Sequence, residues 1–113
     1  MITIYHNPRC SKSRECLQAL EASPEKITVV EYLKEPLNAI ELKGLLKKLN
    51  TKASEVVRKK ESLYIEKYKG KSLTETQWLN ILAQNPILIE RPILVKKNKA
   101  IIGRPAERVK ELL

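Results

Sequence analysis

The order of strand-like and helix-like segments most constrains what this chain can fold into. Residues 2–4 alternate apolar and polar side chains, as in a half-buried strand, and Asn7-Pro8 then interrupts the pattern. Helical spacing predicts a helix from about residue 11 to 22, with an apolar face made of Ser13, Cys16, Leu17 and Leu20. The β-branched segment 27–32 predicts a second strand, so the chain begins as a β-α-β unit.

Helical patterns occupy the middle of the chain. Asn38 and Glu41 form a capping signature for a helix with a leucine stripe, made of Leu42, Leu45, Leu46 and Leu49. Residues 52–84 show a less regular helical pattern, which includes a second capping signature from Thr74 to Gln77. We interpret residues 52–84 as a helical insertion.

The last third of the chain predicts a hairpin and a closing helix. Segments 93–95 and 100–102 flank a polar turn in which Asn98 can adopt a positive φ. Pro105 suits the first turn of the last helix. The complete order, β-α-β-α, helices, β-β-α, predicts an α/β fold: a thioredoxin-like mixed sheet flanked by helices. With 113 residues and no internal repeat, we expect a single domain over residues 1–113.

The chain is basic, with 22 Lys and Arg residues against 13 Asp and Glu residues and a net charge of +9. This charge could serve nucleic acid, an acidic partner, a membrane surface or a small anionic substrate. Lysine clusters are scattered over separate elements, and one Trp and four Tyr form no stripe with them, so we expect no nucleic-acid partner. No apolar run could span a membrane and no signal peptide is visible, so we expect no membrane association and a cytoplasmic location.

The two cysteines have different predicted roles. Cys10 lies at the amino end of the first predicted helix, near Arg9, Lys12 and Arg14. A helix amino end and adjacent cations favour a reactive thiolate, and the free N–H groups there can bind an oxyanion. The alternative is a structural cysteine. Cys16 falls on the apolar helix face and is expected to pack in the core. The two cysteines match neither a disulfide framework nor a metal site, so we expect no bound metal.

Motifs along the whole chain resemble the glutaredoxin-coupled arsenate reductase family. They are His6-Asn7-Pro8-x-Cys10-x-x-Ser13-Arg14, Val57-Arg58-Lys59, Asn85-Pro86-Ile87-Leu88-Ile89-x-Arg91-Pro92-Ile93 and Arg104-Pro105. They occur in order and with comparable spacing, including the helical insertion. Ser11-Lys12 stands where many of these reductases have Gly-Thr. The family is thioredoxin-like in fold and also contains reductase-like proteins of unassigned function and redox-responsive transcription regulators that bind RNA polymerase.

The resemblance implies an oxidoreductase that reduces arsenate to arsenite through a thiolate–arsenate adduct on Cys10. Glutathione then attacks the adduct as co-substrate, and glutaredoxin, as protein partner, removes it. No bound cofactor is implied, and we expect a monomer.

The resemblance also assigns roles to individual residues. Three arginines would hold the oxyanion, and they are Arg58, Arg91 and Arg104. Guanidinium groups suit this task because they stay ionised and pair with two oxygens at once. Ser13 would contact the thiolate or the substrate, His6 would tune the pKa of Cys10, and Pro92 would be a cis-proline facing the cysteine. Each also has a structural alternative: a solvated surface arginine, a backbone-binding serine or a histidine packed on the turn.

Two other functions remain open from the sequence. One is a thiol oxidoreductase or deglutathionylating protein in which Cys10 reacts with glutathione mixed disulfides. The other is a non-catalytic regulator that binds RNA polymerase. Ser13 stands where a dithiol motif has its second cysteine, so an internal redox switch is not expected and an outside thiol must resolve Cys10.

Overall fold

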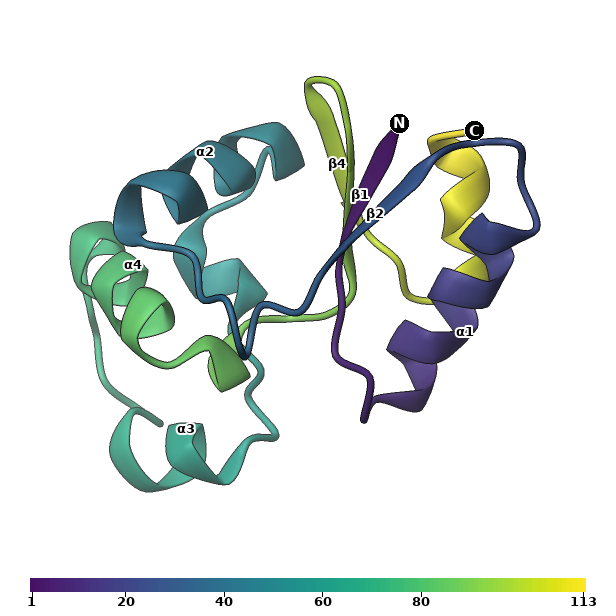
Figure 1. The fold of residues 1–113 in the computed structure, drawn as a ribbon. Helices are drawn as coiled ribbons and strands as arrows, with labels where there is room; N and C mark the ends of the chain where they lie inside the picture. Colours follow the sequence, from purple (N-terminus) through teal and green to yellow (C-terminus); the bar gives the residue numbers. More distant parts are fainter. The chain divides into compact units, whose positions relative to one another are not determined.

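A four-stranded mixed sheet is built from the two ends of the chain (Figure 1). In the computed structural model, which describes residues 1–113, the strand order is β2-β1-β3-β4. The strands are β1 (Ile2–Tyr5), β2 (Ile27–Val30), β3 (Ile93–Lys96) and β4 (Lys99–Ile102). β1 pairs in parallel with β2 and antiparallel with β3, and β3 pairs antiparallel with β4. This arrangement confirms the predicted thioredoxin-like α/β fold.

Two helical segments cover one face of this sheet (Figure 1). α1 (Ser11–Glu21) makes the crossover that a parallel strand pair requires, and η3 (Ala106–Glu111), a 3-10 helix, closes the chain beside it. Buried side chains join these elements into one core: Ile2, Ile4, Cys16, Leu20, Leu94, Ile101, Val109 and Leu112. Cys16 is therefore a core residue, as its helical spacing predicts.

The β3–β4 hairpin turns through a different residue from the one expected. Lys96 pairs with Lys99, which leaves a two-residue loop, and Lys97 has the positive φ of 56°. The sequence pattern predicts this conformation at Asn98, which is wrong. Two-residue hairpin loops favour a positive φ at the first loop position, and Lys97 occupies that position here.

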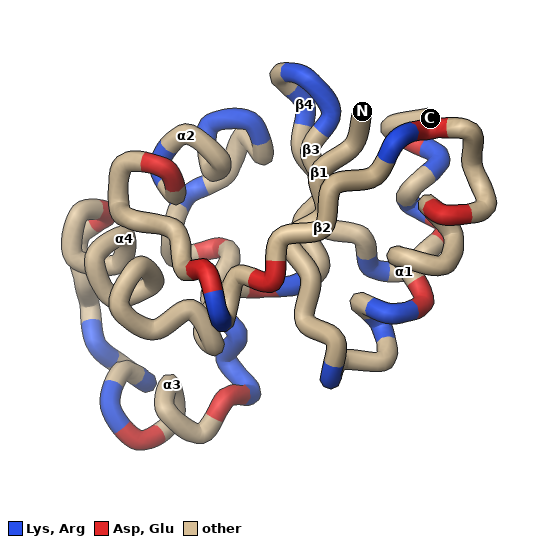
Figure 2. The backbone as a smooth tube through the Cα atoms, in the orientation of Figure 1, with Lys and Arg blue, Asp and Glu red and all other residues tan.

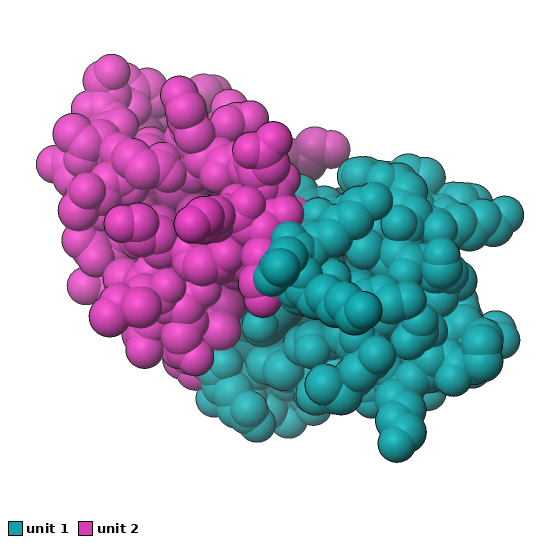
Figure 3. All heavy atoms as spheres, turned by 90° about the horizontal axis from the view of Figure 1, so that it is seen from above, with its two compact units in different colours: residues 1–35, 91–113 teal, residues 36–90 magenta.

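The remaining helices form a second compact unit, which spans Pro36–Glu90, whereas the sheet unit comprises Met1–Glu35 and Arg91–Leu113 (Figure 3). The second unit contains α2 (Ala39–Leu49), η1 (Ala53–Val56), α3 (Ser62–Lys67), α4 (Glu75–Gln84) and η2 (Pro86–Leu88). Both predicted capping boxes are present, at Asn38 for α2 and at Thr74 for α4. This unit includes α2 as well as the predicted insertion at about 52–84. Whether the chain behaves as one domain stays a prediction.

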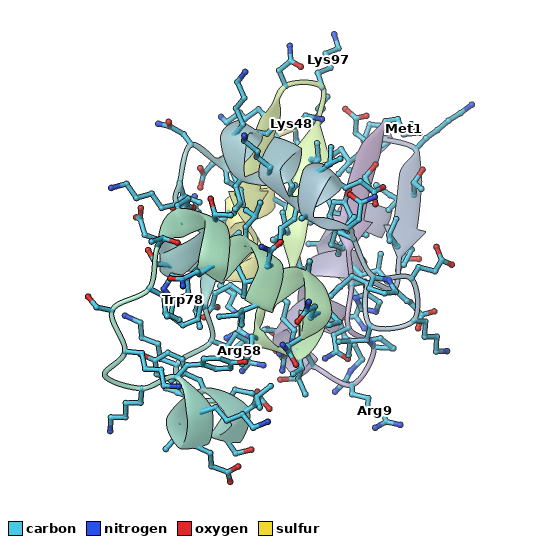
Figure 4. All side chains as sticks on the ribbon, turned by 90° about the vertical axis from the view of Figure 1, so that its left-hand side faces the viewer. Met1, Arg9, Lys48, Arg58, Trp78 and Lys97 are labelled. Carbon is cyan, nitrogen blue, oxygen red and sulfur yellow. The ribbon has the colours of Figure 1, made fainter.

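Trp78 organises one side of the second unit. Trp78, labelled in Figure 4, is buried on α4. The ring centroids of Tyr64 and Tyr68 lie 6.3 and 5.8 Å from that of Trp78. α3 has no buried residue, and Tyr64 on α3 and Tyr68 just after it bring aromatic contacts from this segment to α4.

Candidate active site

Cys10 is positioned by a tight turn between β1 and α1. Its N–H donates to the Asn7 carbonyl at 3.0 Å, and the Arg9 N–H donates to Asn7 Oδ1 at 3.0 Å. Cys10 itself is the N-cap residue of α1, in extended conformation, and no side chain caps the helix. The first N–H groups of α1 are therefore available to the sulfur or to a ligand.

Ser13 lies under this turn and connects it to His6. The Ser13 side chain is fully buried, and its Oγ accepts the Asn7 N–H at 3.1 Å and lies 2.7 Å from His6 Nδ1. Burial lowers the pKa of His6, mainly by desolvation, so the neutral ring is favoured near pH 7. His6 therefore contacts the cysteine turn through Ser13, and it does so as a neutral ring. Its influence on Cys10 stays a prediction.

Two of the three predicted arginines meet at Cys10. Arg104 donates from Nη2 to Cys10 Sγ at 3.4 Å and from Nε to the Arg91 carbonyl at 2.6 Å. The Arg91 side chain reaches the same place, where its charge and hydrogen bonding act on the sulfur. Nε and Nη1 of Arg91 are buried and have no hydrogen-bond partner. Both arginines come from the β3–β4 part of the chain, about 80 to 95 residues from Cys10, which no local pattern around the cysteine could indicate.

The pKa of Cys10 is lowered by a balance of opposing effects. Burial alone would raise it, but N–H groups of Ser13 and Lys12 and the side chain of Arg91 stabilise the thiolate more strongly. By contrast, burial raises the pKa of Cys16 to about 11. The structure therefore gives only Cys10 the character of a nucleophile.

The cations that adjoin Cys10 in sequence are directed elsewhere. Arg9 is exposed and extends away from the ribbon (Figure 4), while Arg14 donates from Nη1 to the Pro8 carbonyl at 2.9 Å. The Lys12 ammonium pairs with Glu15 at 3.9 Å. These three side chains were expected to favour the thiolate, but Arg91 and backbone N–H groups are what lower the pKa of Cys10.

Tyr32 joins this cluster and was not expected there. It follows β2, so it lies at the edge of the sheet where the carboxyl ends of parallel β1 and β2 meet. Its ring is buried, and no group accepts the proton of its hydroxyl. Arg91 acts on it by charge and hydrogen bonding, and Cys10 and Arg104 act on it by charge. The β-branched pattern predicts a strand that includes residue 32, whereas β2 ends at Val30. The sequence signal that could have placed Tyr32 at the site is its position just after β2, the strand that pairs with β1.

Arg58 and Pro92 complete the predicted set. Arg58 belongs to the second unit, where its N–H donates to the Leu88 carbonyl at 2.7 Å and its Nη1 lies 3.6 Å from Glu61 (labelled in Figure 4). Its role in substrate binding stays a prediction. The Arg91–Pro92 peptide bond is cis, at the position that the resemblance indicates, and the Arg104–Pro105 bond is cis as well.

Four further observations bear on the function classes. No group of three or more His, Cys, Asp and Glu side chains is arranged to hold a metal ion. None of the helices combines the length and apolar character that crossing a membrane requires. Lys and Arg occur on many separate elements, including α1, α2 and the β3–β4 turn (Figure 2). A cavity of about 580 Å³ in the second unit, lined by residues of α2 and α4, contains none of the predicted site residues.

Comparison with known proteins decides the family. Residues 5–112 match the sequence profile of the ArsC family. The chain belongs to the ArsC family. Arsenate reductase of Neisseria meningitidis serogroup A is 40% identical over 99% of this ArsC-family chain and 97% of its own. The uncharacterized protein YfgD of Escherichia coli (strain K12) is 46% identical over 99% and 96% of the two chains.

A solved structure supports the same assignment. The arsenate reductase from Vibrio cholerae superposes with a TM-score of 0.94 at 42% identity, covering 99% of this chain and 97% of the other. The ArsC-family fold therefore extends over nearly all of both chains, which confirms the resemblance seen in the motifs.

Proposed function

We propose that this protein reduces arsenate to arsenite, with glutathione and glutaredoxin as the source of electrons, through an adduct on Cys10. The observation that carries the proposal is the meeting of a cysteine of lowered pKa with two guanidinium groups, one of them 3.4 Å from the sulfur. Arsenate reductases among the similar proteins support arsenate as the oxyanion.

The first step is attack of the Cys10 thiolate on arsenic. A sulfur–arsenic bond forms, and an arsenate oxygen leaves as water after taking protons from solvent. Negative charge accumulates because a thiolate meets an anion, so cationic donors must stabilise the transition state. Arg104 is oriented by the Arg91 carbonyl, and Arg91 has free N–H groups, so both are held in place to bind oxygens beside the sulfur. Arg58 is the third arginine in this proposal.

The electrons come from two outside thiols. Glutathione adds its sulfur to arsenic and displaces a second oxygen as water. A glutaredoxin thiolate then attacks the glutathione sulfur. The sulfur–arsenic electron pair stays on arsenic, which becomes As(III), and a mixed disulfide leaves. Water cleaves the remaining Cys10–arsenic bond and releases arsenite. Cys16 cannot replace the outside thiol, since it is fully buried and its thiol has a pKa of about 11.

A coupled assay tests the proposal. Arsenate-dependent oxidation of NADPH is followed in the presence of glutathione, glutaredoxin and glutathione reductase. We expect turnover with the wild type, none with Cys10→Ser, and near wild-type turnover with Cys16→Ala, the matched cysteine control. Loss of turnover in both cysteine variants would contradict the assignment of the nucleophile to Cys10 alone.

The same assay separates the alternative thiol chemistry. Without arsenate, a glutathione mixed disulfide replaces the oxyanion as substrate. Turnover of the disulfide but not of arsenate would favour the deglutathionylating function, which uses the same lowered pKa of Cys10 but leaves the free N–H groups of Arg91 without a purpose.

A further inference from the structure

Tyr32 carries an unused hydrogen-bonding group next to the reactive cysteine. Only 3% of the residue is exposed, and no group in the fold accepts the proton of its hydroxyl. Buried polar groups are nearly always satisfied, because an unpaired one forfeits its bonds to water and gains none. Such a group in a native fold calls for a partner that binds later.

The neighbours of Tyr32 indicate what that partner is. Nε and Nη1 of Arg91 are also buried and unpartnered. Arg91 and Arg104 both act on Tyr32 with positive charge, and Cys10 acts on it with negative charge. Arg91 also acts on Tyr32 by hydrogen bonding, a contact in which the hydroxyl oxygen accepts and keeps its own proton free. This free proton and the N–H groups of Arg91 therefore gather beside one thiolate. A ligand that accepts several hydrogen bonds and carries negative charge satisfies all of them.

We propose that the Tyr32 hydroxyl is a substrate-binding group of this site, which donates a hydrogen bond to an oxygen of the bound oxyanion beside the free N–H groups of Arg91. The inference relies on the proposed function for the identity of the oxyanion as arsenate. As a neutral donor, Tyr32 adds a contact without adding to the positive charge that already surrounds the sulfur.

The protonation state of Tyr32 fits a donor. Burial raises its pKa to about 12, and the charge of Arg91 only partly opposes this effect. The hydroxyl therefore keeps its proton throughout the neutral range and does not act as a base.

A role in binding and a role in packing predict opposite effects on stability. Tyr32→Phe removes an unpaired buried hydroxyl and keeps the ring, so the variant without ligand should be as stable as the wild type or slightly more stable. A hydroxyl with a structural function would instead lower the midpoint of thermal unfolding when removed. Tyr64→Phe is the matched control, because Tyr64 belongs to the second unit and its ring stacks on Trp78.

The experiment measures how well arsenate protects Cys10 from alkylation by iodoacetamide. Protection is the alkylation rate with the anion divided by the rate without it, so it is corrected for any change in the thiol itself. Phosphate serves as a second probe that cannot be reduced. We expect Tyr32→Phe to weaken the apparent affinity for both anions by about 10- to 100-fold, as for loss of a hydrogen bond to a charged group, and Tyr64→Phe to leave it unchanged.

A near-ultraviolet titration gives an independent signal. Arsenate should shift the tyrosine absorption band of the wild type and not that of Tyr32→Phe. Equal anion affinity in Tyr32→Phe and wild type, or a clear loss of stability in the variant without ligand, would overturn the proposal. If the wild type fails to reduce arsenate but Tyr32→Phe still loses protection by arsenate and phosphate, the proposed function is wrong and the assignment of Tyr32 to an oxyanion site stands.

Discussion

Gly103 provides a sharp test of how the core supports the active site. It lies between β4 and Arg104, and a Cβ at this position would lie 2.6 Å from Cys16 Sγ and 3.2 Å from Pro92 Cγ. Both neighbours are fully buried and cannot move into solvent. Gly103 does not have a positive φ, so close approach to Cys16, and not backbone conformation, is what requires glycine here. We predict that Gly103→Ala destabilises the protein.

The size of the effect follows from two opposing contributions. Overpacking a core by one methyl group typically costs about 1–3 kcal/mol. Replacing Gly by Ala regains about 0.4–1 kcal/mol, because the unfolded chain has less conformational entropy to lose. The net loss should be about 1–2 kcal/mol, or roughly 4–8 °C in Tm for a domain of this size.

Gly44→Ala is the matched control. Gly44 is exposed in the middle of α2, and a Cβ there would meet nothing within 4 Å. Alanine should therefore stabilise the helix by about 0.5–1 kcal/mol, the opposite sign to Gly103→Ala. Urea and thermal unfolding, followed by circular dichroism, measure both changes.

The double variant Cys16→Ala/Gly103→Ala tests the contact directly. Removing Sγ makes room for the new methyl group, so the double variant should be more stable than the sum of the two single changes predicts. A wild-type Tm for Gly103→Ala, or strictly additive effects in the double variant, would refute the packing argument. The Gly103 N–H also donates to the Pro92 carbonyl at 2.9 Å, so the same clash should displace the segment that carries Arg104.

Two further predictions concern the cysteine turn. Because its pKa is lowered, Cys10 should react with iodoacetamide at lower pH than an ordinary exposed cysteine. Arg91→Gln should move the midpoint of this pH profile upward, since Arg91 lowers the pKa of Cys10 by hydrogen bonding and charge. An unchanged midpoint would contradict this cause. Ser13→Ala should lower the free energy of unfolding by about 1–3 kcal/mol, because the buried Asn7 N–H loses its acceptor. Equal stability of the variant and the wild type in urea unfolding would show that this hydrogen bond contributes nothing.

The sequence predicted the features of this protein that depend on neighbouring residues. The strand, turn and helix around Cys10, the capping boxes at Asn38 and Thr74, and the burial of Cys16 all follow from short-range spacing, and the structure confirms each. The resemblance to a family indicated the arginines at Cys10, which come from a distant part of the chain.

What the sequence missed depends on contacts between distant segments. The charges of Arg9, Lys12 and Arg14 lie close to Cys10 in the chain, yet local bonds hold the side chains of Lys12 and Arg14, and Arg9 extends away from the ribbon (Figure 4). Tyr32 reaches the cysteine only because β1 and β2 pair in parallel and end at the same edge. Such placements require the tertiary fold, which hydrophobic periodicity does not specify.

The central claim is that Cys10 carries arsenate through reduction. The most direct measurement is the amount of arsenite formed from arsenate, separated by chromatography and quantified by elemental detection, with glutathione and glutaredoxin present. The wild type should form arsenite well above the level produced by glutathione and glutaredoxin alone, and Cys10→Ser should form none above that level. Arsenite formation by Cys10→Ser, or none by the wild type, would contradict the account.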